Sequence, residues 1–375
     1  MKLAFTGDLA FSKYFKSLYD KPDLVDGEIV KFLNDCDCTV ANVEGAISSG
    51  ALNAKKSLIH SNPPECADFL LRINSKVWDI SNNHIIDCGD EGIDSTLECA
   101  KNNGCMPLGA GANVFEASRY AEFEDENGVS VGVFSVTMER FTPKATESNY
   151  GCIVDDDYKK IREIIKDVKS KNKWCVVVAH SGEEFNAVPL PYVRKQFRKY
   201  LKMGADLVVG HHPHVVENYE KVGDKMVFYS LGNFIFDTDY QRLQDYSDVG
   251  VLLNVDFGKN AYTWECMGTK IDRENHKVTK GDVPVIFTDV NSCLYKKLWP
   301  LSARILFLNE RVKRAYTDPG KREFTNKQWL KFEWNRCKKN TGAKDIMRGR
   351  FLYHFGAWKR APKHLIQYVK GNREK

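Results

Sequence analysis

The stretch Lys2-Leu3-Ala4-Phe5-Thr6-Gly7-Asp8 decides the fold of this sequence. Its apolar residues predict a short buried strand over residues 2–6, which carries Asp8 to the end of the strand. A second strand is predicted at residues 38–43, and Glu44 follows it directly. A third is predicted at residues 77–81, followed by Asn82-Asn83-His84. In each case a side chain that can bind a metal ion comes just after a buried strand.

Two later strands end in the same way. Residues 174–179 are strongly β-prone and lead into His180, and residues 206–209 lead into Gly210-His211-His212-Pro213-His214. Helical patterns separate the strands, and Glu126-Asn127-Gly128 predicts a hairpin. Helices are predicted near residues 24–33, 91–103, 155–171 and 188–203, and further strands at 225–230, 249–257 and 261–271. This order is a mixed α/β layout, in which polar residues at the strand ends should converge on one site.

Charge is distributed unevenly along the 375 residues. Residues 291–375 contain 22 Lys and Arg against 6 Asp and Glu, a balance of +16, whereas residues 1–290 contain 33 against 44, a balance of −11. We therefore predict an α/β domain over residues 1–285 and a basic, mainly helical C-terminal extension over residues 286–375. The extension is either a solvated helical face, a segment that packs on the acidic body, or an electrostatic contact with a polyanion or an anionic membrane surface. Nucleic acid is disfavoured because no nucleic-acid-binding module is recognisable.

Short apolar runs and scattered cysteines predict a cytoplasmic protein. The N-terminal apolar run is far too short for a signal peptide, and no stretch approaches the roughly 18 apolar residues of a membrane-spanning helix. The 11 cysteines form no regular frame, which is typical of reduced thiols in the cytosol. A peripheral association with the inner membrane remains compatible with these features.

The residues at the strand ends combine oxygen and nitrogen ligands. Hydrolases with two divalent ions use such mixtures, and a bridging carboxylate commonly ties ions about 3.5–4 Å apart. The chain supplies, in order, Asp8, Glu44, Asn83, His180, His212 and His214. Taken alone, Asp8 could cap a turn, Asn83 could close one and His180 could be a core histidine. His212-Pro213-His214 favours a metal site more strongly, because two imidazoles around a rigid proline point the same way from an extended segment.

The motifs together resemble the bacterial capsule-synthesis family, the CapA-type proteins of poly-γ-glutamate capsule biosynthesis. The resemblance covers residues 2 to about 240 and is specific because six motifs occur in the same order. They are Gly7-Asp8, Asn42-Val43-Glu44-Gly45, Ser81-Asn82-Asn83-His84 with Asp87-Cys88-Gly89, His180-Ser181-Gly182-Glu183, Gly210-His211-His212-Pro213-His214, and Tyr229-Ser230-Leu231-Gly232-Asn233-Phe234.

The resemblance implies the fold of calcineurin-like phosphoesterases, a metallophosphoesterase-like β-sandwich flanked by helices. It also implies roles for the ligand candidates. Asp8 and His214 would bind a first metal ion, Glu44 would bridge two ions, and Asn83, His180 and His212 would complete the second. His84 would act near the leaving group as a general acid or a charge stabiliser. One or two divalent ions are expected, with Mn, Fe and Zn as the alternatives.

The sequence departs from active phosphoesterases at one position. Their first motif is Asp-x-His, whereas this chain reads Asp8-Leu9-Ala10, so one ligand of the first metal is missing. The capsule family in general also lacks this histidine. Glu183 and Asp87 are the nearest substitutes, and the alternatives are that Glu184 beside Glu183 serves or that neither glutamate does. Glu183 is accordingly predicted, with His84, as a catalytic residue.

Two functions from different classes follow. The first is a metal-dependent hydrolase or transferase whose substrate is an anionic polymer or a phosphorylated precursor. The second is a non-catalytic metal- or polymer-binding component of a capsule or polysaccharide assembly. Ala10 favours the second function, and His84, which is not needed as a ligand, favours the first. The basic extension could contact capsule-assembly proteins or the membrane in either case.

Overall fold

We analysed a computed structural model of the chain, which describes residues 1–48, 60–139, 141–290, 293–299, 301–302, 325 and 328. The basic extension predicted over residues 286–375 therefore lies largely outside the described residues. The chain divides into two compact units, of which the first comprises Met1–Pro189 and Val193–Val290. The first unit contains all the predicted site residues. Within the described ranges no helix has both the length and the apolar character needed to cross a membrane.

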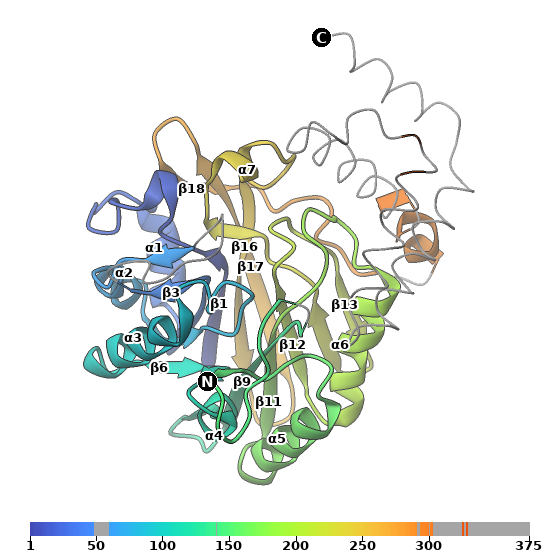
Figure 1. Ribbon diagram of the computed structural model, residues 1–375. Helices are drawn as coiled ribbons and strands as arrows, with labels where there is room; N and C mark the ends of the chain where they lie inside the picture. The colour runs from blue at the N-terminus through green and yellow to red at the C-terminus, as the bar shows by residue number, and fades with distance from the viewer. Residues whose placement is uncertain are drawn as a thin grey trace. The chain divides into compact units, whose positions relative to one another are not determined.

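The first of two large sheets is built around the N-terminal strand. Its order is β18-β17-β16-β1-β2-β5-β6, and β15 also pairs with β1. Strand β1 runs parallel to β2 and antiparallel to β16, so it lies in the middle of the sheet (Figure 1). The strands are β1 (Lys2–Leu9), β2 (Cys38–Val43), β5 (Ser75–Asp79), β6 (Met106–Leu108), β15 (Asn233–Ile235), β16 (Val249–Phe257), β17 (Tyr262–Asp272) and β18 (Lys277–Gly281).

The second large sheet has the order β13-β14-β12-β11-β9-β8. Strands β9, β11, β12 and β14 are mutually parallel, and β8 and β13 form antiparallel edges. The hairpin predicted around residues 126–128 is confirmed as β8 and β9. The strands are β8 (Ala121–Glu124), β9 (Ser130–Thr137), β11 (Trp174–His180), β12 (Leu207–His211), β13 (Tyr219–Val222) and β14 (Lys225–Phe228).

Both sheets contribute to one hydrophobic cluster. Leu3 and Phe5 of β1 share this cluster with Val176 and Val178 of β11, and all four side chains are fully buried. Alternate residues of a strand point to opposite faces, so β1 directs Ala4 into a second cluster, on the other face of its sheet. Helices cover that face: α1 (Gly27–Asn34), α2 (Cys66–Arg72) and α3 (Gly89–Asn102).

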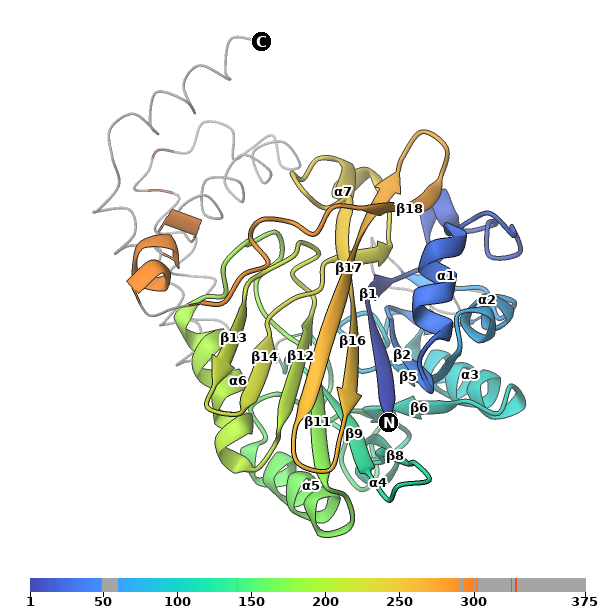
Figure 2. The same cartoon turned by 180° about the vertical axis from the view of Figure 1, so that it is seen from behind.

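Helices α5 (Tyr158–Lys171) and α6 (Pro191–Met203) cover the outer face of the second sheet (Figure 2). Two glycines allow these helices to pack closely on the sheet. A Cβ atom on Gly132 of β9 would lie 2.5 Å from Val168 of α5, and one on Gly210 of β12 would lie 2.9 Å from Phe197 of α6. The mixed α/β prediction is therefore confirmed, with the predicted helices near residues 24–33, 91–103, 155–171 and 188–203 all present.

Strand β1 is longer than the sequence indicated. It continues to Leu9 and includes Asp8, because both β15 and β2 pair with this end of the strand; the β15 pairs are Asp8↔Asn233 and Leu9↔Ile235, with an irregularity between them. Gly7 allows this close pairing, since a Cβ atom there would lie 2.3 Å from the carbonyl oxygen of Gly232. Asp8 is thus held by hydrogen-bonded backbone on both sides.

Short elements complete the first unit. They are the 3-10 helix η1 (Lys13–Phe15), the helices α4 (Val114–Ala117) and α7 (Asp239–Arg242), and the two-residue strands β3 (Ala46–Ile47), β4 (Ser61–Asn62), β7 (Ala110–Gly111) and β10 (Gly151–Cys152). Three of these short elements come next in the chain after residues near the strand ends: β3 follows Glu44, β4 follows His60, and α7 follows Asn233.

Candidate metal centre

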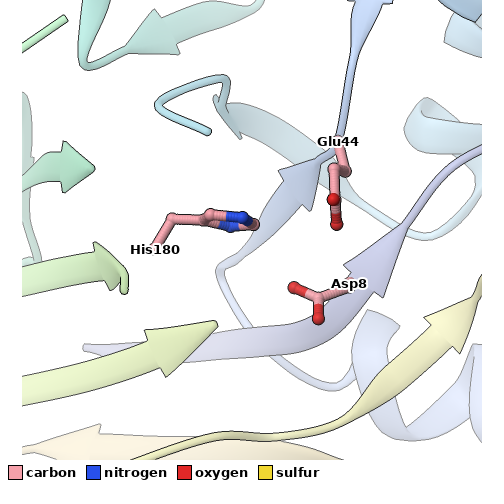
Figure 3. Close-up of side chains that lie close together, drawn as sticks. All are labelled: Asp8, Glu44 and His180. Carbon is pink, nitrogen blue, oxygen red and sulfur yellow. The ribbon is translucent and has the colours of Figure 1, made fainter. Parts of the chain in front are cut away.

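Three strand ends bring Asp8, Glu44 and His180 together. Asp8 belongs to β1, Glu44 is the first residue after β2, and His180 is the last residue of β11. One potential ligand atom from each lies within 4.8 Å of the others. Figure 3 shows the two carboxylates and the imidazole directed toward a common space. These residues come from both large sheets, so the cluster joins the two sheets at their carboxyl-terminal edges.

The environment of Glu44 fits a bound cation. Its side chain is fully buried, and neither carboxylate oxygen has a hydrogen-bond partner among the described residues. A buried carboxylate without donors is strongly destabilised, and burial raises the pKa of Glu44 well above its ordinary value despite the opposing effect of His214. A divalent cation is the partner that two unsatisfied carboxylate oxygens beside a second carboxylate would accommodate.

Asp8 is oriented by neighbours on both sides. The side-chain amide of Asn42 donates a hydrogen bond to Oδ1 of Asp8 at 2.7 Å, and the backbone N–H of His212 donates to the same oxygen at 3.4 Å. Burial alone would raise the pKa of Asp8, but the close contact and charge of His214 lower it below its ordinary value. The carboxylate is therefore held ionised and fixed in direction.

His214 lies between the two carboxylates. Its Nδ1 is 3.1 Å from Oδ2 of Asp8, and its Nε2 is 3.6 Å from Oε1 of Glu44. The amide oxygen of Asn233 is 3.0 Å from the same Nδ1. Burial lowers the pKa of His214, but the two carboxylates outweigh it and raise the pKa to about 10. His214 thus contacts both carboxylates of the predicted first-metal site.

The residues predicted for the second metal also lie together. Nε2 of His180 is 2.9 Å from Oδ1 of Asn83, and the rings of His180 and His212 are 5.1 Å apart. Burial, followed by neighbouring imidazoles, lowers the pKa of His180 well below its ordinary value. Burial lowers that of His212 to about 4. Neutral imidazoles are the form that ligates metal ions.

His84 stands at the edge of this cluster. Its Nδ1 is 2.6 Å from Oδ2 of Asp87, and its Nε2 is 3.8 Å from Oε1 of Glu44. The His84 side chain is 17% exposed, whereas those of Glu44 and Asp87 are 0% exposed. His84 is therefore oriented by a buried carboxylate and is accessible from outside, as a proton donor to a substrate needs to be.

The loop after β11 carries two glutamates with different surroundings. Glu183 is buried, and its catalytic role stays a prediction. The charge of Glu184 acts on Glu44, His212 and His214, raising the pKa of all three groups. That Glu184 serves the site in place of Glu183 stays a prediction.

Sequence reasoning missed His60. Its ring contacts that of His84 edge-on, with the centroids 4.3 Å apart, and its backbone N–H donates to Oδ2 of Asp87 at 3.0 Å. Phe236 packs against both His60 and His214. No strand end or motif pointed to His60, because only the pairing of β3 with β4 brings it to the site.

The fold and the site together describe a mixed α/β protein with a candidate centre for divalent cations. Residues 2–238 match the bacterial capsule synthesis protein PGA_cap, and because this match covers more than half of the chain, the protein belongs to that family. The resemblance found in the sequence motifs is thereby confirmed.

Individual relatives carry related names. The PGA biosynthesis protein CapA of Bacillus subtilis (strain 168) is 28% identical over 250 residues, which cover 65% of this chain and 66% of the relative. The capsule biosynthesis protein CapA of Bacillus anthracis is 28% identical over 256 residues, covering 65% and 62%. A probable polyglutamine synthesis accessory protein of Mycobacterium tuberculosis (strain ATCC 25618 / H37Rv) is 24% identical over 216 residues, covering 54% and 56%. The chain spans 56% to 66% of the length of these relatives.

Proposed function

We propose that the protein is a metal-dependent hydrolase or transferase acting in the biosynthesis of poly-γ-glutamate or a surface polysaccharide. One observation carries the proposal: Glu44 is fully buried beside Asp8 and His180, and its carboxylate oxygens have no hydrogen-bond donor among the described residues. The names of the relatives support the biological setting, since two are called capsule or PGA biosynthesis proteins.

We further infer that the two sheets with helices on their outer faces correspond to the flanked β-sandwich of calcineurin-like phosphoesterases. The shared hydrophobic cluster between the sheets supports this inference. So does the position of the cluster of Asp8, Glu44 and His180 at the carboxyl ends of β1, β2 and β11.

In the proposed site, Asp8, Glu44 and His214 would hold one cation, and Glu44, Asn83, His180 and His212 would hold a second. When bound, a divalent cation supplies Lewis acidity toward a carbonyl or phosphoryl centre. The protein contributes fixed ligands: Asn42 orients Asp8, and Asn233 orients His214. Burial keeps His180 and His212 neutral and available as ligands.

His84 is the proposed proton donor to the leaving group. Its contact with Asp87 fixes the ring through Nδ1 and leaves Nε2 directed toward the side of Glu44. Nε2 would therefore be the ring nitrogen that carries the proton toward the reacting bond. Proton transfer of this kind contributes roughly 10²- to 10⁴-fold to the rate. The substrate would be an amide or ester linkage of an anionic polymer, or a phosphorylated precursor.

A second candidate function rests on Ala10. This residue is buried two positions after Asp8, and its methyl side chain offers no ligand where active phosphoesterases have an imidazole. A protein with one well-formed cation site could bind metal and polymer within an assembly without catalysing a reaction.

One experiment separates the two functions. The purified chain is analysed for bound metal, and turnover is measured on poly-γ-glutamate and on a phosphodiester, for the wild type, for His84→Ala and for the control His276→Ala. His276 stacks on Tyr14 and is not among the predicted site residues. We expect bound metal in all three proteins and a 10²- to 10⁴-fold lower kcat only in His84→Ala.

The outcomes are distinct. A protein without metal would contradict both functions. Bound metal without turnover of either substrate by the wild type would favour the assembly component. Equal loss of activity in His84→Ala and in the control would contradict the role of His84.

A further inference from the structure

A groove on the outer surface of α5 is lined by basic side chains. It has a volume of about 330 Å³ and is lined by Tyr158, Lys159, Arg162, Glu163 and Lys166. Helix α6 flanks it, because Lys199 of α6 lies over the ring of Tyr158, with its Nζ 3.0 Å from the ring centroid. We call this surface, with Lys195, Lys199 and Lys202 of α6, the α5–α6 groove.

Cations of α5 line this groove, and a second stripe of cations lies on α6, whose Lys199 reaches the groove at Tyr158. Positions 159, 162 and 166 lie on one side of α5, and positions 195, 199 and 202 lie on one side of α6, since residues three, four and seven apart share a helix face. None of these six cations has a carboxylate partner among the residues that the structure describes. Other cations of the same helices do: Lys160 pairs with Glu163 at 3.4 Å, and Lys171 with Asp167 at 3.1 Å.

The stripes are close enough to repel each other. Burial, then the positive charges of Arg162 and Lys195, lower the pKa of Lys199 below its ordinary value. Like charges gathered without counter-charges destabilise the folded chain, and a bound anion would relieve that repulsion. Glu163 is the only acidic residue lining the groove, and Lys160 already pairs with it.

The shape and chemistry of the groove favour an extended polycarboxylate. No large apolar side chain of α5, or of α6 from Val193 onward, is strongly exposed, so these segments offer nothing to insert into a membrane. The ring of Tyr158 is already covered by Lys199, which leaves no stacking platform for nucleic-acid bases. The chain's own residues 291–375 do not fit either, because their balance of +16 has the same sign as the groove.

The groove begins at the edge of the sheet that carries the metal cluster. Ser181, the residue after His180, donates a hydrogen bond to Oδ2 of Asp155 at 2.7 Å. Asp155 lies three residues before Tyr158, the first residue of α5. An extended polymer in the groove would therefore reach the loop that follows His180.

We propose that the α5–α6 groove is a binding site for an anionic polymer, poly-γ-glutamate or a chain of similar carboxylate spacing, separate from the metal ligands. This rests on the proposed function, because the polymer is taken from the setting proposed for the family. The groove would hold a polymer segment while the metal cluster acts on a neighbouring linkage.

The test measures binding of fluorescently labelled poly-γ-glutamate to the full chain by anisotropy at low ionic strength. The groove variant combines Arg162→Gln, Lys166→Gln and Lys199→Gln. A matched control removes the same charge from exposed positions outside the groove, with Lys31→Gln, Lys171→Gln and Lys173→Gln. Exposed ion pairs are each weak, so loss of three contacts should weaken binding about tenfold, against about twofold or less for the control. The difference should shrink as salt is added, because salt screens exposed charges.

Folding is checked by circular dichroism and by the thermal midpoint, which should match the wild type in both variants. Equal weakening in the two variants, or none in the groove variant, would overturn the proposal. The same titrations with an oligothymidylate and with vesicles of anionic lipid identify the ligand class. If the groove variant weakened either of these more than it weakened poly-γ-glutamate, the polycarboxylate assignment would be wrong.

Failure of the groove and failure of the proposed function are distinguishable. Metal content and turnover of a short substrate should be unchanged in the groove variant. His84→Ala should lose turnover while binding the polymer normally. Binding through the groove without turnover by the wild type would therefore retain this site and reject the enzyme.

Discussion

Replacement of Glu44 by Gln should affect the protein only when metal is present. In a chelator, the amide keeps the volume of the side chain and removes a buried carboxylate that has no hydrogen-bond donors. The variant also loses the long contact with His214, 3.6 Å in the structure. These effects oppose each other, so we expect the free energy of unfolding without metal to change by about 1 kcal/mol or less.

With metal the difference should be large. A ligand that binds only the folded state at a free concentration 1,000 times its Kd stabilises that state by about 4 kcal/mol. For a domain of 150–250 residues 1 kcal/mol shifts Tm by roughly 2–4 °C, and the shift is smaller for a larger unit, so the wild type should gain about 5–10 °C. An amide is a much weaker metal ligand than a carboxylate, so Glu44→Gln should lose most of this gain.

Differential scanning calorimetry in EDTA and in Mn²⁺, Fe²⁺ or Zn²⁺ measures both quantities. Glu28→Gln is a suitable control, because Glu28 is an exposed carboxylate on α1 that pairs with Lys280 at 2.6 Å. It should retain the full metal-dependent gain. The reasoning is refuted if Glu44→Gln keeps that gain, or if it destabilises the protein by several kcal/mol in EDTA, since Glu44 would then have a structural partner.

Two further predictions concern the buried framework around the site. Asp79 is fully buried, and burial raises its pKa to about 7, so the folded state holds a proton that the unfolded state has released between about pH 4 and pH 7. The free energy of unfolding should therefore fall as pH rises through this window, by at most about 4 kcal/mol for the roughly three-unit shift. Asp79→Asn should lack that loss. Urea unfolding measures both, and parallel pH dependences of the two proteins would contradict the prediction. Gly7→Ala should lower the free energy of unfolding by about 1–3 kcal/mol or more, because its Cβ atom would lie 2.3 Å from the carbonyl oxygen of Gly232. Gly27→Ala is the control and should be nearly neutral, because its Cβ atom would have nothing within 4 Å. Similar urea midpoints for the two variants would show that the close pairing is not as described.

Much of the site could be predicted because each ligand sits at a fixed offset from a recognisable strand. Cys38–Val43 was predicted with its observed bounds, and Glu44 follows it as expected. Asp8 was expected just beyond its strand, but β1 includes it, because both β2 and β15, a strand from a distant part of the chain, pair with its end. The local apolar pattern of a strand does not indicate a pairing partner more than 200 residues away.

The choice between neighbouring residues needed the folded structure. Glu183 and Glu184 are equivalent in the sequence, yet the charge of Glu184 acts on His212 and His214. His60 follows no predicted strand, and only the β3–β4 pairing places it beside His84. Side-chain direction in a loop depends on backbone angles that tertiary contacts impose, so composition and spacing do not determine it.

The sequence by itself therefore determined the order of strands and helices, the family, and the set of residues able to bind a cation. The tertiary structure decided which of these meet, because contact between β1, β2 and β11 depends on the order of strands within two sheets and on their packing face to face. It also decided their chemistry. The burial that raises the pKa of Glu44 and lowers that of His180 comes from side chains scattered along the whole first unit, whose combined effect exists only in the folded chain.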